Sequence, residues 1–496
     1  MDRASGILLP ISALPSPYGI GTLGKAAYAF ADFLHAAGQK YWQLLPLGPT
    51  SYGDSPYQSF STFAGNPYFI DLDLLAEEGL LDKEDLAAAD WGNDPRYVDY
   101  GKIYEVRFDV LRRAFLRGRE RDREAVERFQ AENPWLKNYA LYMAVKAHFG
   151  MKSWLEWPDE AIRVRAPEAV ARYEKELAED VAFYTYLQYL FFKQWGELRE
   201  YIHSLGIRII GDLPIYVASD SADVWANPQQ FQLDEDLCPT EVAGCPPDGF
   251  SEDGQLWGNP LFDWEGMAEN RYQWWMRRVA FQFTIYDVLR IDHFRGFDSY
   301  YAIPAGDKNA RRGRWRPGPG IAFFNILKET LGDRPIIAED LGFLTPSVHQ
   351  MLADTGYPGM KVLEFAFDHR DSGQNLYLPH NYPVNCIAYV GTHDNDTALG
   401  WTRTADPDDV AAARAYLNLT PEEGENWGMM RGIWASAARY TIVQMQDVLG
   451  LGSEGRINTP STTGENWQWR ATPGYLTQEL AHRLYRMTKL YGRLRP

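Results

Sequence analysis

Four acidic residues follow short apolar segments of this 496-residue chain, and together they could carry out chemistry. They are Asp212 in GDLPI, Asp292 in RIDHF, Glu339 in AEDLG and Asp394 in THDND. A single acidic residue at a strand end is commonly a helix cap or a turn residue. Four of them indicate a shared site, because the carboxyl ends of strands in a closed parallel barrel meet at one mouth.

The RIDHF segment places an arginine and an aspartate on one face of a strand. Arg290 and Asp292 are two residues apart, whereas Leu289 and Ile291 face the other side. If the apolar pair packs on helices, Arg290 and Asp292 point into the barrel, where the guanidinium favours the ionised carboxylate. An ionised, oriented carboxylate can attack C1 of a sugar. A purely structural Arg–Asp pair is the alternative.

Glu339 follows the apolar run PIIA, so we expect burial to raise the pKa of its carboxyl group. Such a group can donate a proton near neutral pH. Its neighbour Asp340 points the opposite way and is expected to cap the next helix. Asp394 and His393 belong to a polar cluster that could also be a turn or part of a metal site. One histidine with adjacent carboxylates lacks a ligand geometry, so no metal is predicted.

One attacking and one protonating carboxylate are the minimum for retaining cleavage of a glycosidic bond. Their carboxyl groups should lie about 5–5.5 Å apart, against roughly 6.5–9.5 Å for inversion. A third carboxylate would stabilise the positive charge of the transition state.

The elements that must position these residues are eight short apolar runs with helical patterns between them. Near-continuous apolar runs are typical of strands buried on both faces, and eight of them predict an α/β fold of the (β/α)8 TIM-barrel type. The runs occupy residues 6–12, 41–47, 207–215, 288–294, 335–341, 361–367, 385–393 and 456–462.

The spacing of these runs also predicts the domain organisation. About 160 residues separate the second and third runs, far more than one helix and its loops require. Amphipathic patterns predict a large, mainly helical insertion over 65–180, and Pro, Gly and Asp indicate a loop-rich insertion over 217–285 that covers the site. The barrel then takes its first two strands from 1–64, its third from 181–216, and the remaining five from 286–496. One closing helix follows the eighth strand, without a C-terminal β-domain.

Composition excludes several classes of function. A net charge of −18 argues against nucleic acid, because binding phosphates needs clustered Lys and Arg. Three cysteines without a CxxC pair indicate neither a disulfide framework nor a zinc site. Without a signal-peptide pattern or an apolar run of about 18 residues, we expect a cytoplasmic protein that does not bind membranes. No phosphate-loop or acyl-transfer motif is present, no cofactor is expected, and no oligomeric state is predicted.

Two turn-rich loops could cover the barrel mouth. The loop PTSYGDSPYQSFSTFAGNPYFID follows the second run and contains Tyr57. The segment PPDGFSEDGQLWGNPLFDW is punctuated by Gly and Pro and has Trp257 at its expected tip. A glycine-flanked aromatic on a long loop is a candidate lid or sugar platform, and a loop anchored by a buried Trp is the alternative.

In this order, the motifs resemble the 4-α-glucanotransferases of glycoside hydrolase family 77, also called amylomaltases or disproportionating enzymes. The likeness runs almost end to end, through LPISALPSPYGIGTLG, GPTSYGDSPYQSFSTFAGNP, GDLPIYVASDSADVWANP, PPDGFSEDGQLWGNP, RIDHFRGF, IIAEDLG, GTHDNDT and NWQWR. The resemblance implies that Asp292 forms a covalent glycosyl–enzyme, Glu339 is the acid/base and Asp394 stabilises the transition state. It also implies a set of residues lining the sugar subsite at the bond to be cut: Tyr57, Asp212, Arg290 and His393. The loop around Trp257 would cover the donor and acceptor subsites.

The function implied is transfer of α-1,4-glucan segments between maltooligosaccharides or starch- and glycogen-type glucans, by a retaining double displacement. An α-amylase-like hydrolase using the same residues is one alternative, and a non-catalytic glucan-binding protein is another. The chain departs from the family pattern at Gly249, where an aromatic is common, and at Ser461, where a glycine is common.

Overall fold

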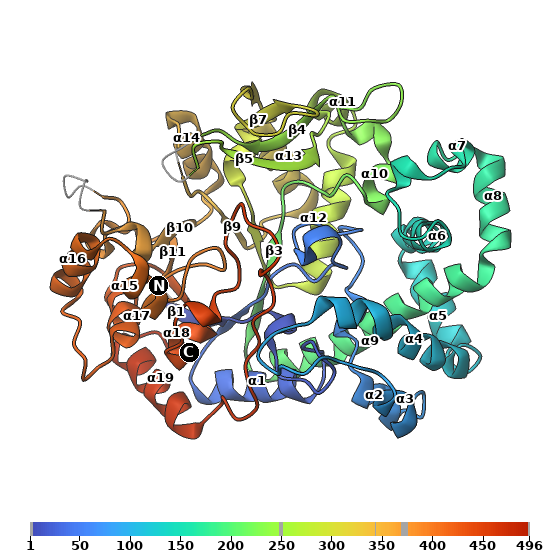
Figure 1. Ribbon diagram of the computed structural model, residues 1–496. Helices are drawn as coiled ribbons and strands as arrows, with labels where there is room; N and C mark the ends of the chain where they lie inside the picture. Colours follow the sequence, from blue (N-terminus) through green and yellow to red (C-terminus); the bar gives the residue numbers. More distant parts are fainter. Residues whose placement is uncertain (1–2, 248–250, 343, 369–374, 495–496) are drawn as a thin grey trace.

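Eight parallel strands close into a barrel in the computed structural model, which describes residues 3–247, 251–342, 344–368 and 375–494 (Figure 1). The strands follow the order β1-β12-β11-β10-β9-β6-β3-β2 around the barrel. Their bounds are β1 (Ala4–Leu8), β2 (Tyr41–Gln43), β3 (Arg208–Leu213), β6 (Val288–Ile291), β9 (Ile336–Ala338), β10 (Gly359–Val362), β11 (Cys386–Tyr389) and β12 (Tyr440–Gln444). The predicted (β/α)8 fold is confirmed.

Seven of the eight predicted runs coincide with or overlap barrel strands, but the eighth prediction was wrong. The last strand is β12, and residues 456–462 form no strand. β12 was missed because two buried polar residues, Thr441 and Gln444, interrupt its apolar pattern. The run 456–462 instead ends in an exposed turn from Pro460 onward.

The strands at the start of the chain approach each other very closely. A Cβ atom on Gly6 of β1 would lie 2.4 Å from the carbonyl oxygen of Tyr41 on β2. No side chain fits at that distance from a backbone atom, so glycine is required there.

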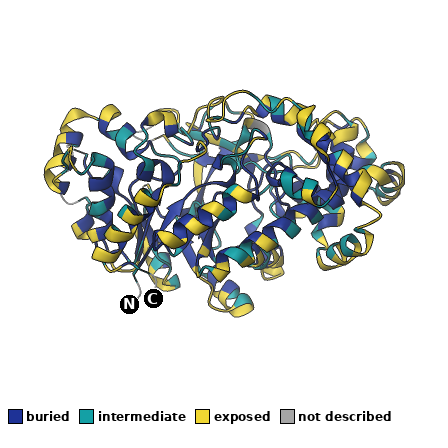
Figure 2. Ribbon diagram, turned by 90° about the horizontal axis from the view of Figure 1, so that it is seen from below, coloured by how far each residue is buried: buried dark blue, intermediate teal, exposed yellow. Residues whose placement is uncertain are grey.

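Helices cover the outside of the barrel with their apolar faces inward. Figure 2 shows buried central strands surrounded by helices whose outer faces are exposed. The helices packed around the barrel and its C-terminal side are α1 (Lys25–Ala36), α12 (Gln273–Ile285), α13 (Ile321–Leu331), α14 (Pro346–Thr355), α15 (Ala398–Thr404), α16 (Pro407–Leu417), α17 (Glu425–Ala435), α18 (Met445–Leu449) and α19 (Gln478–Leu490). The predicted closing helix is α19. It packs beside α1, so a helix near the end of the chain lies next to one near its start. Within the part of the chain that the structure describes, no helix has the length and apolarity that a bilayer span needs.

Helices fill the stretch between β2 and β3, at the right of Figure 1. They are α2 (Leu72–Glu77), α3 (Lys83–Ala87), α4 (Tyr100–Gly118), α5 (Arg123–Glu132), α6 (Trp135–His148), α7 (Glu160–Arg163), α8 (Pro167–Glu176) and α9 (Ala178–Ser204). The long helix α9 packs against α4, α5, α6 and α8, and also against α1 of the barrel layer. One continuous helix therefore joins the inserted helices to the barrel.

A second, antiparallel sheet lies at the top of Figure 1, in the order β5-β4-β7-β8. Its strands are β4 (Glu241–Cys245), β5 (Gln255–Pro260), β7 (Ser299–Pro304) and β8 (Arg314–Pro317), and α10 (Ala222–Ala226) and α11 (Trp264–Glu269) flank it in sequence. The sequence predicted only loops over the first two strands and did not predict the sheet. β5 and β8 are partly exposed, so they lack the apolar run that marks a barrel strand, whereas β4 and β7 are mostly buried.

Candidate active site

Arg290 lies at the centre of the group of charges inside the barrel mouth. Its side chain is 5% exposed, and Nη1 donates to both carboxylate oxygens of Asp212 at 2.7 Å. Nη2 lies 2.9 Å from Oδ1 of Asp292. Burial alone would lower the pKa of Arg290, but the two carboxylates raise it well above its usual value. A permanently charged guanidinium therefore joins the ends of β3 and β6. Strand alternation predicted that Arg290 and Asp292 lie on one face, but it did not predict the contact with Asp212.

Asp292 and Glu339 come from neighbouring strands and differ in their surroundings. The side chain of Asp292 is 30% exposed, whereas Glu339 is partly buried and accepts backbone N–H bonds from His293 and Leu341, each at 2.8 Å. Burial, and then the negative charge of Asp292, raise the pKa of Glu339 to about 7, although Arg290 and the two N–H groups oppose the shift. The expected rise is confirmed. Glu339 can thus hold a proton near neutral pH beside a carboxylate paired with arginine.

Tyr57 connects two sides of the mouth. Its hydroxyl donates to Oδ2 of Asp212 at 2.7 Å, and its ring stacks on His393 with centroids 5.2 Å apart and planes 19° apart. Nε2 of His393 lies 3.3 Å from Oδ1 of Asp394. Trp467 packs against the rings of both Tyr57 and His393. The residues predicted from separate motifs therefore form one contiguous cluster.

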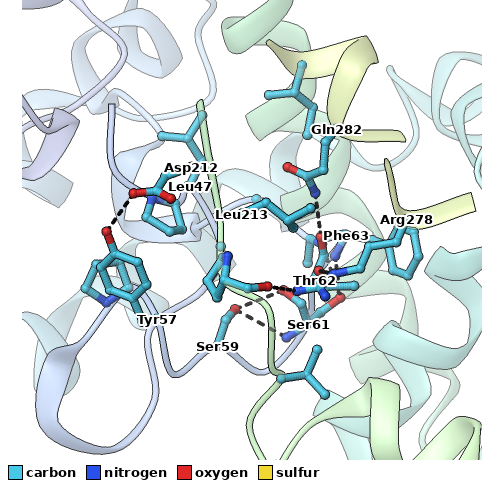
Figure 3. A pocket seen from close by; sticks show the side chains of 18 of the residues that line it. Leu47, Tyr57, Ser59, Ser61, Thr62, Phe63, Asp212, Leu213, Arg278 and Gln282 are labelled. Atoms are coloured by element: carbon cyan, nitrogen blue, oxygen red, sulfur yellow. Dashed lines mark hydrogen bonds between the residues drawn. The ribbon is translucent and has the colours of Figure 1, made fainter. Parts of the chain in front are cut away.

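The loop that carries Tyr57 is held from behind by polar side chains, as Figure 3 shows. On α12, Arg278 donates to Oγ1 of Thr62 at 2.7 Å and Gln282 donates to the carbonyl of Thr62 at 2.9 Å. Asp223 on α10 accepts from the backbone N–H of Thr62 at 2.8 Å. Tyr57, Thr62 and these α12 side chains line a pocket beside Asp212. Three contacts to one residue fix the position of a loop that has no regular secondary structure there.

Trp257 lies on β5 of the small sheet, so its predicted place at a loop tip was wrong. The ring is half-buried and meets the imidazole of His293 edge-on, with centroids 4.9 Å apart. It also packs near Tyr216. A residue on a strand is held more firmly than one at a loop tip. The ring of Trp257 is therefore held against His293, which follows β6.

His293 was not predicted as a site residue, yet it is built into the site. Its backbone has φ 52°, in the left-handed region that β-region strand residues avoid, and this turn directs its N–H at Glu339. Burial lowers the pKa of its imidazole to about 4, so the ring is neutral at pH 7. Among the described residues, its buried Nε2 has no hydrogen-bond partner. Its place next to Asp292 was the only signal in the sequence.

Three further predictions concern single residues. Asp340 does not cap a helix: Oδ1 accepts from the backbone N–H of Met360 at 2.6 Å, while Thr345 precedes α14. Ser461 has φ 63°, the conformation that glycine adopts most readily. Gly249 lies outside the described residues. Across the described ranges, no group of three or more His, Cys, Asp or Glu side chains has the arrangement of a metal site.

The fold and this cluster together define a class: a (β/α)8 protein with a group of carboxyl side chains at the carboxyl ends of its strands, where enzymes of this fold have their active sites. A family model described as 4-alpha-glucanotransferase, glycoside hydrolase family 77, matches residues 9–477. The 4-alpha-glucanotransferase of Clostridium butyricum is 51% identical over 486 residues, covering 97% of this chain and 99% of the relative. That of Thermus thermophilus is 47% identical over 506 residues and 100% of both chains.

Solved structures agree with this assignment. An amylomaltase from Streptococcus agalactiae, in complex with acarbose, superposes with a TM-score of 0.97 at 45% identity over 100% of both chains. This chain therefore belongs to the 4-alpha-glucanotransferases of glycoside hydrolase family 77, and it transfers segments of α-glucans to acceptor glucans.

Proposed function

We propose that transfer proceeds by a retaining double displacement in which Asp292 is the nucleophile and Glu339 the acid/base. A carboxylate oxygen of Asp292 attacks C1 of the donor sugar and forms an ester bond to it. The bond from C1 to the leaving oxygen breaks as Glu339 gives that oxygen its proton. The 4-hydroxyl of an acceptor glucan then passes its proton to Glu339 and attacks C1, which releases Asp292. Two inversions at C1 give net retention.

The observation that carries this proposal is the arrangement of two carboxyl groups: Asp292 is paired with Arg290, and the neighbouring Glu339 is partly buried with its pKa raised to about 7. A carboxyl group protonated near pH 7 and an arginine-paired carboxylate are what acid and nucleophile require at the same pH. Asp394 stands across the mouth, half-exposed, where a negative charge stabilises the developing positive charge on the sugar ring.

The same proposal gives the neighbouring polar residues the task of holding the sugar at the bond to be cut. The contacts described above connect four of these side chains: Asp212, Arg290, Tyr57 and His393. A sugar hydroxyl that binds one of them therefore binds a side chain whose position the others fix. Trp257 and the small sheet cover the donor and acceptor side, and they favour transfer because they exclude water that competes with the acceptor. The substrates we propose are maltooligosaccharides and starch- or glycogen-type α-1,4-glucans.

Trapping the covalent intermediate tests the mechanism. With α-maltotriosyl fluoride as donor, the Glu339→Gln variant should accumulate glycosyl–enzyme, because fluoride leaves without a proton while the acceptor step lacks its base. Intact-mass and peptide mass spectrometry should place one glycosyl group on Asp292. The matched control, Asp292→Asn, should gain no mass. A glycosyl group on any other residue, or full activity of Asp292→Asn, would overturn the proposal.

Incubation of the native enzyme with maltotriose measures how much of the reaction goes to water. A ladder of products longer than maltotriose is expected from transfer. Products limited to glucose and maltose would mean that water outcompetes the acceptor, as in the α-amylase-like alternative.

A further inference from the structure

The segment 456–458, which the sequence analysis assigned to a strand, instead runs beside the residues that follow β11. The backbone N–H of Asn458 donates to the carbonyl of His393 at 3.1 Å. The side chain of Asn458 donates from Nδ2 to Oδ1 of Asp394 at 2.7 Å. Arg456 donates from Nη2 to the backbone carbonyl of Asp394 at 2.8 Å. Three hydrogen bonds thus join this segment to one dipeptide of the site.

The segment is itself stiffened by further contacts. Nε of Arg456 donates to the carbonyl of Asn458 at 2.9 Å. One guanidinium therefore contacts both its own segment and the backbone of Asp394. Between them, the carbonyl of Ile457 accepts from the N–H of Trp467 at 2.7 Å, and the ring of Trp467 packs on His393. Asn458 therefore contacts Asp394 from a segment that these hydrogen bonds hold in place.

The two carboxylate oxygens of Asp394 have different surroundings. Oδ1 receives Nδ2 of Asn458 and lies 3.3 Å from Nε2 of His393. Among the described residues Oδ2 has no hydrogen-bond donor, and the side chain is 45% exposed. A carboxylate of a short side chain can rotate about two torsions, and a donor on one oxygen selects the rotation that presents the other oxygen to the mouth.

We propose that Asn458 and Arg456 are positioning residues that orient Asp394 toward the reacting sugar: Arg456 fixes the backbone and Asn458 fixes the carboxylate. The inference rests on the proposed role of Asp394 in stabilising the transition state. Electrostatic stabilisation requires a group held within about half an ångström of its working position, so loss of either support lowers the rate of the chemical step more than it lowers binding.

The test compares Asn458→Ala with Asn466→Ala, using maltotriose. Asn466 lies in the same loop and accepts from the N–H of Thr459 at 2.9 Å, but it does not contact Asp394 in the structure. We expect Asn458→Ala to lower kcat by about 10- to 100-fold while KM changes less than about threefold. Asn466→Ala should retain kcat within about threefold. Equal losses in both variants would mean that the loop is merely destabilised, and would overturn the inference.

A double-mutant cycle with Asp394→Asn separates positioning from direct contact with the sugar. With α-maltosyl fluoride as donor to keep residual turnover measurable, Asn458→Ala should cost no more than about twofold in the Asp394→Asn background. A full additional loss there would show that Asn458 acts on the substrate independently of Asp394.

Arg456→Lys supplies a second variant, which retains the charge and one donor. It should keep part of the activity that Arg456→Met loses, and thermal melts should show that both variants fold. Equal activity of these two variants would exclude the backbone contact from Arg456. If Asp394→Asn alone leaves kcat unchanged, the proposed role of Asp394 fails. If Asp394→Asn is inactive and Asn458→Ala is fully active, only the positioning inference fails.

Discussion

The raised pKa of Glu339 predicts how transfer activity falls at high pH. Its pKa is raised from the usual 4.5 to about 7, chiefly by burial and by the charge of Asp292. A rise in pKa of this size corresponds to roughly 3 kcal/mol of preference for the protonated form. If Glu339 is the acid, kcat/KM should be half its maximum near pH 7, about a tenth at pH 8 and about a hundredth at pH 9. With an ordinary carboxyl group, activity would already be falling near pH 5.

The origin of the shift can be measured directly in the free enzyme. Carboxyl ¹³C NMR of protein labelled at the glutamate side chains follows the titration of Glu339, and Glu339→Gln identifies its resonance. Asp292→Asn removes the neighbouring charge with little change in shape, and should lower the midpoint of Glu339 by about one unit. The exposed Asp354→Asn on α14 is the matched control and should leave it unchanged. A midpoint at or below pH 5 in the native enzyme, or one that Asp292→Asn does not move, would refute this reasoning.

Three other predictions concern the site and the barrel. Tyr57→Phe removes the donor to Asp212 and should lower kcat/KM for maltotriose by about 10- to 100-fold, the equivalent of about 1.5–3 kcal/mol for a bond to a charged group; an unchanged kcat/KM would contradict this. Burial raises the pKa of Asp447 from 3.8 to about 7, so its contribution to stability is complete below about pH 4 and is lost as the pH rises through 7. Asp447→Asn should therefore stabilise the fold by up to about 4 kcal/mol more at pH 8 than at pH 4, and equal melting shifts at both pH values would exclude this origin. Gly6→Ala should destabilise by about 2 kcal/mol or more, because its Cβ meets a backbone carbonyl, whereas Gly196→Ala, in the open on α9, should stabilise by about 0.5–1 kcal/mol in the same urea titration.

Strand positions were predictable where both faces of a strand are apolar. The apolar run around Leu289 and Ile291 predicted β6. Alternation along this strand then predicted that Arg290 points into the barrel, where it is buried. β12 escaped because Thr441 and Gln444 are buried there, and burial of polar side chains depends on partners from other parts of the chain. In the small sheet, β5 and β8 were not predicted as strands because they are partly exposed and carry no continuous apolar run.

The sequence by itself determined the barrel and the carboxyl-bearing motifs, because apolar periodicity and strand alternation are local properties of the chain. Only the tertiary structure decided how the motifs meet. Arg290 contacts Asp212, 78 positions away in sequence, and Tyr57 reaches Asp212 across 155. The pKa of Glu339 and the grip of Asn458 on Asp394 likewise arise from closure of the barrel, since burial and hydrogen bonds between distant segments exist only once the chain has folded.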